Sequence, residues 1–168
     1  MLEDKNLSLT MQELMPLVAD ELASGKEVML TVKGVSMMPF LRHNKDSIIM
    51  TALNGRSINI GDLVMFRRAD GSYAMHRICR INADGSFDIV GDAQLKCDEN
   101  ITYDMLVAYV PRVIKNGKEI SCEKGFWRFA MVSYMHLRLK HPKIAFKIYA
   151  VLRKIKHTIK SDMENDNE

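Results

Sequence analysis

One serine, one histidine and two aspartates are the residues of this chain whose types and order suit covalent catalysis. Ser36 follows the apolar run 28–32 and lies between Gly34, which permits unusual backbone angles, and Pro39, which ends regular structure. A serine hydroxyl is a weak nucleophile, so it needs a base, and the base needs a third group that holds its tautomer and stabilises its positive form. The alternative is a serine in an ordinary turn between two strands, since glycine and proline are common there.

His76 is the best candidate for the base. It lies in an alternating run that places Ala74, His76 and Ile78 on one face of a strand. The alternative is a histidine that belongs to the core or to the edge of the sheet. His43 is the second candidate, although the polar residues 44–46 beside it indicate a solvated turn. The remaining histidines lie in the basic C-terminal part of the chain and are His136, His141 and His157.

The third group is expected in the polar loop 91–99, which follows another apolar run. This loop carries Asp92 and Asp98. If the preceding run pairs with the strand of His76, the loop lies at the edge of the sheet where a group that orients the histidine is needed. The alternative is that neither aspartate is catalytic: Asp92 would then form a turn after Gly91, and Asp98 would be a charge on the surface.

Short runs of strand-forming residues separated by turn dipeptides predict a β-rich fold. The turn pairs are Asp70-Gly71, Asp84-Gly85 and, as the strongest signal, Asn116-Gly117. The regular spacing of these runs favours a mainly antiparallel sheet that curls toward a barrel, flanked by helices. The expected strands cover residues 28–32, 46–50, 57–60, 63–68, 73–81, 86–90, 105–113 and 118–122.

An amphipathic helix is expected over residues 11–24. Thr10 and Glu13 have the spacing of a capping box, apolar residues follow at helical intervals, and Gly25 supplies a stop. Pro16 either kinks this helix or marks a later start. We expect the helix to cover one face of the sheet, and docking to a partner or to a membrane surface is the alternative.

The spacing of the apolar residues changes from a strand-like to a helix-like pattern after residue 122. Two sets of residues then recur at steps of three or four, and His141 and Pro142 separate them, so we expect two amphipathic helices broken at the proline. The stripe positions are Phe126, Phe129, Ala130, Ser133 and Leu137 in the first helix and Ile144, Ile148, Val151, Leu152, Ile155 and Ile159 in the second. Lysines occupy other positions of the second helix, at 143, 147, 154 and 156.

Charge is unevenly distributed along the chain. The 168 residues have a formal net charge of +3, but residues 123–160 hold ten Lys or Arg and one acid, and residues 161–168 hold four acids and no base. The basic helices suit an anionic membrane surface, with Phe126, Trp127 and Tyr134 at the interface. Packing on the sheet with solvated lysines is the alternative. Nucleic-acid binding is not expected, because no base-reading motif accompanies the charge.

The composition is that of a folded domain with a genuine core, since 47% of the residues are hydrophobic. Three cysteines without metal-ligand or CxxC spacing predict reduced thiols in a cytosolic protein, with no metal site and no cofactor. The polar N-terminus does not resemble a secretory signal, and no apolar run approaches the length of about 18 residues that a membrane span requires. We therefore expect a cytoplasmic protein, peripheral on the inner face of the membrane if its basic helices dock there.

Four short motifs in order resemble type I signal peptidases and the related LexA-type peptidases. Gly-Val-Ser-Met-Met-Pro at 34–39 is similar to their serine box, and Gly-Asp-Leu-Val at 61–64 is similar to the strand that follows it. Met-His-Arg-Ile at 75–78 resembles the His-Arg box of the archaeal, eukaryotic and sporulation-type branch, which has histidine where most bacterial enzymes have lysine. The segment 91–98, Gly-Asp followed six positions later by a second Asp, resembles the last box of that branch.

The resemblance implies a signal-peptidase-like fold and a Ser/His/Asp site that hydrolyses peptide bonds. By position, Ser36 is the nucleophile, His76 is the general base, and Asp98 is the charge-relay aspartate with Asp92 as an accessory acid. The backbone N–H of Ser36 would bind the oxyanion, and an extended substrate with small side chains before the scissile bond would pair beside the serine stretch. The residues expected to touch that substrate are Gly34, Val35, Met37 and Pro39.

The sequence therefore predicts a serine endopeptidase that cleaves a peptide or precursor protein after small residues. It departs from the family at the position of the transmembrane anchor, where it has the amphipathic helix 11–24. An inactive peptide-binding or scaffold protein on the same fold is the alternative. A self-cleaving repressor is disfavoured, because one helix before Lys33 is too little for a helix-turn-helix domain and His76 replaces the lysine of that group.

Four segments follow from this interpretation. We expect an N-terminal helical segment at 1–26, a β-rich peptidase domain at 27–122, a basic helical segment at 123–160 and an acidic disordered tail at 161–168.

Overall fold

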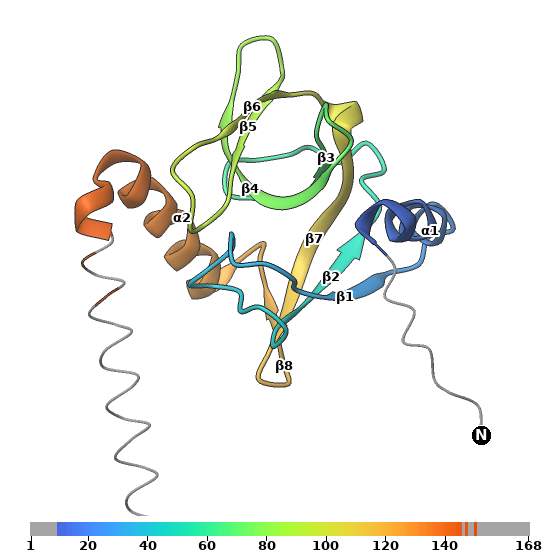
Figure 1. The fold of residues 1–168 in the computed structure, drawn as a ribbon, viewed down its shortest axis with the longest axis horizontal. Helices are drawn as coiled ribbons and strands as arrows, with labels where there is room; N and C mark the ends of the chain where they lie inside the picture. The colour runs from blue at the N-terminus through green and yellow to red at the C-terminus, as the bar shows by residue number, and fades with distance from the viewer. Residues whose placement is uncertain (1–9, 146, 148–149, 151–168) are drawn as a thin grey trace, which may run out of the picture.

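A curled antiparallel sheet lies between two helices in the computed structural model, which describes residues 10–145, 147 and 150 (Figure 1). The elements in chain order are α1 (Met11–Ala23), β1 (Val28–Thr31), β2 (Ser47–Thr51), β3 (Leu63–Arg67), β4 (Tyr73–Ile81), β5 (Phe87–Val90), β6 (Asp98–Ile101), the short 3-10 helix Tyr103–Met105, β7 (Leu106–Lys115), β8 (Lys118–Ser121) and α2 (Gly125–Lys140).

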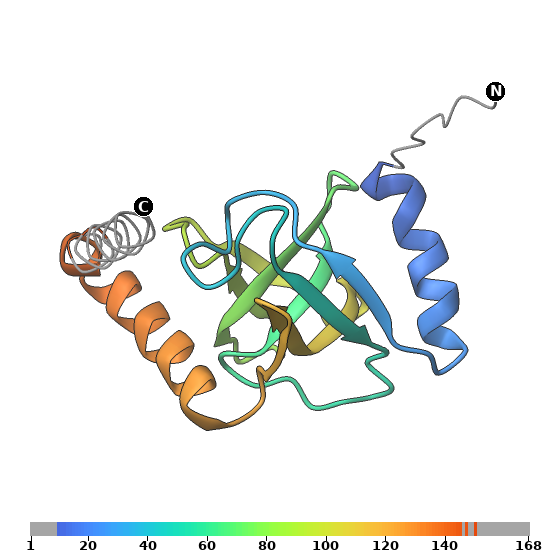
Figure 2. The same ribbon diagram turned by 90° about the horizontal axis from the view of Figure 1, so that it is seen from below.

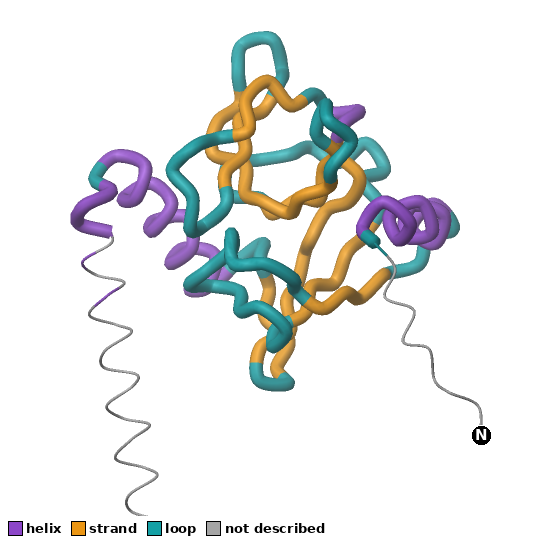
Figure 3. Tube along the Cα trace, viewed as in Figure 1, coloured by secondary structure: helices purple, strands orange, loops and turns teal. Residues whose placement is uncertain are grey.

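All strand pairs of the described chain are antiparallel, as the sequence predicts. The strands follow the order β1-β2-β7-β3-β4-β5-β6, and β8 forms a hairpin with β7. That hairpin turns at Asn116 and Gly117, which both have the positive φ that its turn requires. Figure 3 shows how the strands curl around, so that the sheet is strongly bent.

The curl gives the sheet two buried faces. In β3, Leu63 and Met65 point into one apolar cluster, while Val64 and Phe66 point into the other. The first cluster also contains residues of both helices, and the second is formed by strands and loops within the curl. Figure 2 shows α1 and α2 on opposite sides of the sheet. β3 is therefore held by packing on both of its faces.

The first helix covers the sheet, as the sequence predicts. Thr10 and Glu13 form the expected capping box, and Pro16 lies inside the helix. Its buried residues are Met15, Val18 and Leu22, which belong to the first apolar cluster. Because α1 contacts both β1 and β4, it bridges two strands that are not neighbours in the sheet.

The second helix packs on the domain through two of the aromatic residues that one interpretation places at a membrane. Trp127 and Tyr134 both make edge-on contacts with Phe40, at ring-centroid distances of 5.7 and 5.4 Å. Phe126 and Phe129 instead point outward, with 81% and 68% of their surface exposed. The helix thus combines an inward face that packs with an outward aromatic face.

The break between the two predicted C-terminal helices is confirmed. The N–H of His141 closes the last turn of α2, and helical backbone resumes at Pro142. Most stripe positions of the second helix lie outside the described residues, as do His157, the lysines at 154 and 156, and the acidic tail. Within the described residues, the structure contains no helix with the length and apolar character that a membrane crossing demands.

Two strand predictions need correction. The predicted strand at 57–60 is a loop that ends in a turn at residues 60 and 61, where the N–H of Asn59 donates to the Asp62 carboxylate at 2.9 Å and Gly61 has a φ of +91°. Conversely, the end of the predicted loop 91–99 belongs to the edge strand β6, Asp98–Ile101. Its first three residues are Asp, Glu and Asn, so it shows none of the apolar alternation by which strands are predicted.

Candidate active site

Ser36 lies in a turn that several hydrogen bonds hold in shape. The turn begins at Gly34, whose φ of +90° suits a residue without a Cβ and whose N–H donates to Nδ1 of His43 at 2.9 Å. The N–H of Met38 then donates to the carbonyl oxygen of Val35 at 3.1 Å. His43, the second candidate for the base, therefore anchors the serine turn through the backbone. Ser36 itself is half-buried.

The predicted acidic loop contacts the serine turn directly. The N–H of Ala93 donates to the carbonyl oxygen of Ser36 at 2.7 Å. A Cβ on Gly91 would lie 2.8 Å from that same oxygen and 3.0 Å from Nε2 of His76, closer than real side chains pack. A glycine at position 91 therefore lets three segments far apart in the sequence meet.

His76 is buried between its acid partner and the serine turn. Only 2% of its surface is exposed, and its ring packs at 5.9 Å from the ring of Phe66. Its Nδ1 lies 3.2 Å from Oδ2 of Asp98. Since a carboxylate can only accept, Nδ1 carries the proton of this bond, which leaves Nε2 unprotonated and facing Gly91 and the turn of Ser36.

The Ser36 hydroxyl and His76 form no hydrogen bond with each other in the described chain. Bonds between nucleophile and base are often long in enzymes without substrate and shorten in the complex. The backbone N–H of Ser36 is also without an acceptor among the described residues, so it is free to donate to a ligand.

Asp98 binds two cationic or potentially cationic partners at once. Arg68 donates to Oδ1 from Nε at 2.6 Å and to Oδ2 from Nη2 at 2.9 Å, and Oδ2 is also the oxygen that His76 contacts. Burial raises the pKa of Asp98, but the hydrogen bonds and charge of Arg68, with a further contribution from His76, lower it more. The carboxylate is therefore ionised at neutral pH and can stabilise a protonated imidazole.

Burial lowers the pKa of His76 below its ordinary value. The charge and hydrogen bond of Asp98 raise this pKa, and the positive charge of Arg68 lowers it again. The net depression keeps the imidazole neutral at pH 7, which is the form a general base requires.

If His76 acts as the base of a peptidase, as the sequence predicts, we expect Arg68→Gln to move the acid limb of the pH–rate profile to higher pH. The substitution removes a cation that disfavours the imidazolium and keeps Asp98 and Asp92, whose negative charges favour it, so the pKa of His76 rises. The measurement is kcat/KM against pH, which reports the pKa of the base in the free enzyme. Arg67→Gln, at an exposed neighbouring arginine, is the control and should leave the limb unchanged. A limb that stays in place in the Arg68 variant would contradict the arrangement.

Asp92 lies against a different partner, Arg77. The two side chains are fully buried and form a paired contact with distances of 3.1 and 2.9 Å. Arg77 follows His76 directly in β4, so the two side chains point to opposite faces of the strand. Asp92 therefore fastens its loop to the far side of β4, while Asp98 is the acid that contacts the histidine.

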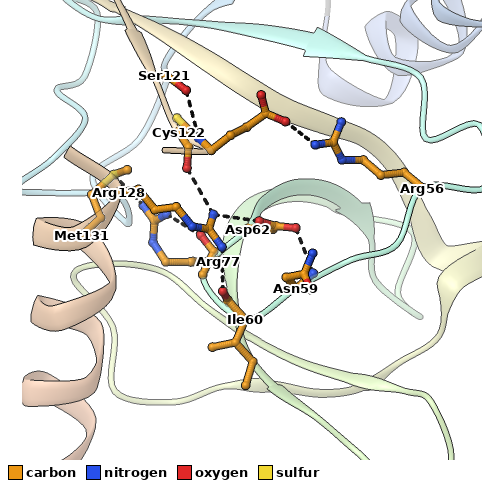
Figure 4. Close-up of polar contacts among 11 residues, drawn as sticks. Arg56, Asn59, Ile60, Asp62, Arg77, Ser121, Cys122, Arg128 and Met131 are labelled. Carbon is orange, nitrogen blue, oxygen red and sulfur yellow. Dashed lines mark hydrogen bonds and ion pairs between the residues drawn. The ribbon is translucent and has the colours of Figure 1, made fainter. Parts of the chain in front are cut away.

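The Arg77 side chain also joins the sheet to α2. It donates to the carbonyl oxygen of Gly61 at 2.9 Å and contacts the sulfur of Met131 (Figure 4). Beside it, Arg128 donates to Asp62 at 2.9 Å and to the carbonyl oxygen of Ile60 at 3.0 Å. This network holds the turn before β3 against the second helix and supports β4 from behind the site.

A cavity of 440 Å³ opens beside the serine and the histidine. Ser36, His76, Gly34 and Met37 all line it, whereas Val35 and Pro39 are not among its lining residues. The lining also includes residues that the sequence did not single out, namely Arg68, Gln94 and the α1 residues Met11 and Leu14. Arg68 differs from the other arginines only in its position after β3, which is too weak a signal for prediction.

Two unpaired strand edges border this cavity. β1 ends the sheet on one side, so its outer edge has no strand partner in the described chain. β4 pairs with β5 only from Arg77 onward, which leaves residues 73–76 without a partner on that side. Such edges offer backbone N–H and C=O groups to an added extended peptide.

The three cysteines are unbridged, and the sulfur atoms of Cys79 and Cys97 are 3.7 Å apart. Burial raises the pKa of Cys79 to about 12, so this thiol is protonated at neutral pH. No group of three or more His, Cys, Asp or Glu side chains in the described chain is placed to hold a metal ion.

A scan against protein-family models and a search of curated proteins both give no match to this sequence.

Proposed function

We propose that this protein is a serine endopeptidase with Ser36 as nucleophile, His76 as general base and Asp98 as the group that orients the base. The observation that carries the proposal is the position of His76. Its Nδ1 contacts Asp98 at 3.2 Å, and its Nε2 faces the turn of Ser36 at the wall of a cavity. The order of the four motifs supports a signal-peptidase-like fold and a Ser/His/Asp peptidase of that superfamily.

The proposed reaction begins with acylation of Ser36. Nε2 of His76 takes the proton of the Ser36 hydroxyl as the oxygen attacks the carbonyl carbon of the peptide bond. The ionised Asp98 stabilises the resulting imidazolium, and the free N–H of Ser36 donates to the developing oxyanion. The imidazolium then gives its proton to the leaving amine, and an ester joins the acyl part of the substrate to Ser36.

Water then hydrolyses the ester, with the water as nucleophile and the Ser36 oxygen as leaving group. His76 takes a proton from the water that attacks the ester, and returns it to the Ser36 oxygen as the acyl group leaves. Asp92 takes no part in this chemistry in our proposal and acts through the position of its loop. Cofactors are not required for any step.

The substrate is proposed to bind as an extended strand. The unpaired edges of β1 and of residues 73–76 border the cavity, so backbone hydrogen bonds would hold the peptide with its scissile bond near Ser36. The resemblance implies small side chains just before that bond. A peptide or precursor protein with an extended segment is thus the expected substrate.

Hydrolysis of a peptide library tests the proposal. The wild-type protein is incubated with synthetic peptides of mixed sequence near pH 7.5, and new N-termini are identified by mass spectrometry. Internal cleavage that stops in Ser36→Ala supports the peptidase. Peptides that bind without cleavage, in a protein that no serine-acylating probe labels, would favour the inactive peptide-binding alternative.

We also propose that α2 docks on an anionic membrane surface through its outward face. Phe126 and Phe129 are 81% and 68% exposed there, and Ile60, which lines a hollow together with Phe129, is 41% exposed. The exposed Lys124 lies just before α2 and the exposed Lys140 ends it, and further lysines follow along the chain. Apolar side chains with surrounding cations are typical of interfacial helices.

Phe126→Ala with Phe129→Ala is expected to lower the partition of the protein onto anionic vesicles by about tenfold or more, since each phenylalanine contributes roughly 1.5–3 kcal/mol when buried. The measurement is flotation with vesicles that contain phosphatidylserine. Leu17→Ala is the matched control, because this residue is 55% exposed on the other helix. Wild-type protein that fails to float at low salt would overturn the membrane proposal.

A further inference from the structure

We propose that Cys79 and Cys97 form a reversible disulfide bond when the protein meets a low-molecular-weight disulfide such as oxidised glutathione. Neither cysteine takes part in the proposed peptidase chemistry, so the pair is a separate site. The bond would tie the segment before Asp98 to the strand that carries His76. The proximity of the two thiols, the access to one of them and the cations around them support this proposal.

The two thiols are already in contact. Their sulfur atoms are 3.7 Å apart, although the residues are 18 positions apart in the chain. A disulfide bond is about 2.05 Å long, so the sulfur atoms must approach by roughly 1.7 Å. Cys97 directly precedes β6, an edge strand that pairs only with β5 in the described chain and does so with an irregular register. A small shift at this end of β6, together with rotation of the two side chains, therefore closes the bond.

Cys97 is the thiol that an oxidant can reach. It lines a hollow of 360 Å³ whose wall also contains Arg68 and Lys96, and their positive charges suit the carboxylates of glutathione. Cys79 instead donates from its Sγ to the carbonyl oxygen of Asp88 at 3.2 Å, so its thiol is engaged within the sheet. We therefore expect Cys97 to attack the small disulfide and Cys79 to resolve the product.

A buried arginine of α2 lies close to both thiols. Figures 1 and 2 show that the loop between β5 and β6 runs beside α2. Arg138 has 1% of its surface exposed, and its guanidinium has no hydrogen-bond partner among the described residues. Burial lowers the pKa of Arg138, and the nearby acidic groups Asp92, Tyr134, Cys97 and Cys79 counteract this shift. Such a cation stabilises the thiolates through which thiol–disulfide exchange passes.

The exchange takes place in two balanced steps. The Cys97 thiolate attacks one sulfur of oxidised glutathione, the S–S bond of glutathione breaks, and one glutathione leaves as a thiolate that takes up a proton. The Cys79 sulfur then loses its proton to water and attacks Sγ of Cys97, and the second glutathione leaves and is protonated in turn. The protein thus gives up two protons and two electrons, which the two released glutathione thiols carry.

The first step makes the second thiol more reactive. Burial raises the pKa of Cys79, and the negative charge of the Cys97 thiolate raises it further. Once Cys97 is bound to glutathione this charge is gone, so Cys79 gives up its proton more readily. Because the sulfur that it attacks lies beside it, the internal attack is faster than attack by a second glutathione.

The bond would restrict the acid of the candidate site. Cys79 lies three residues after His76 in β4, and Cys97 is the residue before Asp98. The disulfide therefore joins the two segments whose side chains form the contact between Asp98 and His76. We expect the oxidised protein to unfold at a temperature about 5 °C or more above that of the reduced protein, because the bond constrains the unfolded chain. Amide hydrogen exchange at residues 92–100 should also become slower.

Titration with reduced and oxidised glutathione tests the proposal. Full-length wild-type protein is equilibrated at rising fractions of oxidised glutathione, quenched with acid and mapped by mass spectrometry without reduction. We expect one intramolecular disulfide between Cys79 and Cys97, which dithiothreitol reverses. Cys122 is buried, so it should stay free, and Cys122→Ala should behave as the wild type. Two free thiols, or glutathione adducts alone, at the highest oxidised fraction would overturn the proposal.

Single variants test the order of the two steps. Cys79→Ser should accumulate a glutathione adduct on Cys97, because the second attack is lost, whereas Cys97→Ser should form an adduct at least about tenfold more slowly. A faster adduct on Cys79 than on Cys97 would overturn this order. Equal unfolding temperatures and equal hydrogen exchange in the oxidised and reduced wild type would overturn the restriction of the acid. Should a serine variant fail to fold, the alanine variant serves in its place. None of these results depends on whether the protein cleaves peptides.

Discussion

Ser36→Ala is expected to reduce peptide hydrolysis by at least about a thousandfold, and His76→Ala by a similar factor. In the proposed mechanism, the first substitution removes the atom that forms the acyl-enzyme, and the second removes the group that accepts its proton. Because the two residues act as one unit, the double variant should be scarcely worse than either single one. The measurement is the initial rate of cleavage of one peptide identified from the library.

Stability measurements accompany these rates. Ser36 is half-buried and its hydroxyl contributes no hydrogen bond to His76, so its removal should leave thermal unfolding close to that of the wild type. Ser72→Ala controls for the loss of another serine hydroxyl on a loop beside the site. A Ser36→Ala protein that cleaves at more than a tenth of the wild-type rate would contradict the assignment.

Asp98→Asn and Asp92→Asn should fail in different ways. Asp98→Asn removes the charge that stabilises the protonated His76, so we expect kcat to fall on the order of 10²- to 10⁴-fold with little loss of stability. Asp92→Asn leaves the fully buried Arg77 without a counter-ion, so the free energy of unfolding should drop by about 3–5 kcal/mol. Activity and urea unfolding, measured on both variants, separate the two roles.

The reverse pattern would be decisive against our assignment of the acids. Under conditions where both variants are folded, Asp98→Asn should be the slower enzyme. If Asp92→Asn lost activity at full stability, its carboxylate would act in the chemistry and the contact between Asp98 and His76 would be incidental.

Local signals account for the parts of the fold that were predicted correctly. The capping box of Thr10 and Glu13 and the Asn116-Gly117 turn depend on neighbours a few residues away, so the sequence states them directly. The loop at 57–60 is wrongly predicted as a strand because Ile58 and Ile60 alternate with polar residues, while the Asp62 side chain and Arg128, a residue of α2, bind the backbone of this loop. The contact between Arg128 and Ile60 joins residues 68 positions apart, so the local sequence pattern cannot predict it.

The candidate site shows the same division. Ser36, His76 and Asp98 were predicted from motif order, and the structure brings their segments together around Gly91. Arg68 was not predicted, because its contact with Asp98 depends on how the turn after β3 folds against β6. The sequence also did not predict that α1 lines the cavity. A helix that packs on a sheet and a helix that lines a cavity both need apolar residues at the same spacing, so the pattern cannot separate the two.

A serine-reactive phosphonate probe tests the central claim most directly, because it forms a stable bond only with an activated serine. The protein is incubated with the probe, and its intact mass and peptide map are recorded by mass spectrometry. We predict a single adduct on the peptide that contains Ser36, absent in Ser36→Ala and strongly reduced in His76→Ala. An unlabelled wild-type protein that circular dichroism shows to be folded, or an adduct on a different serine that persists in Ser36→Ala, would contradict the account.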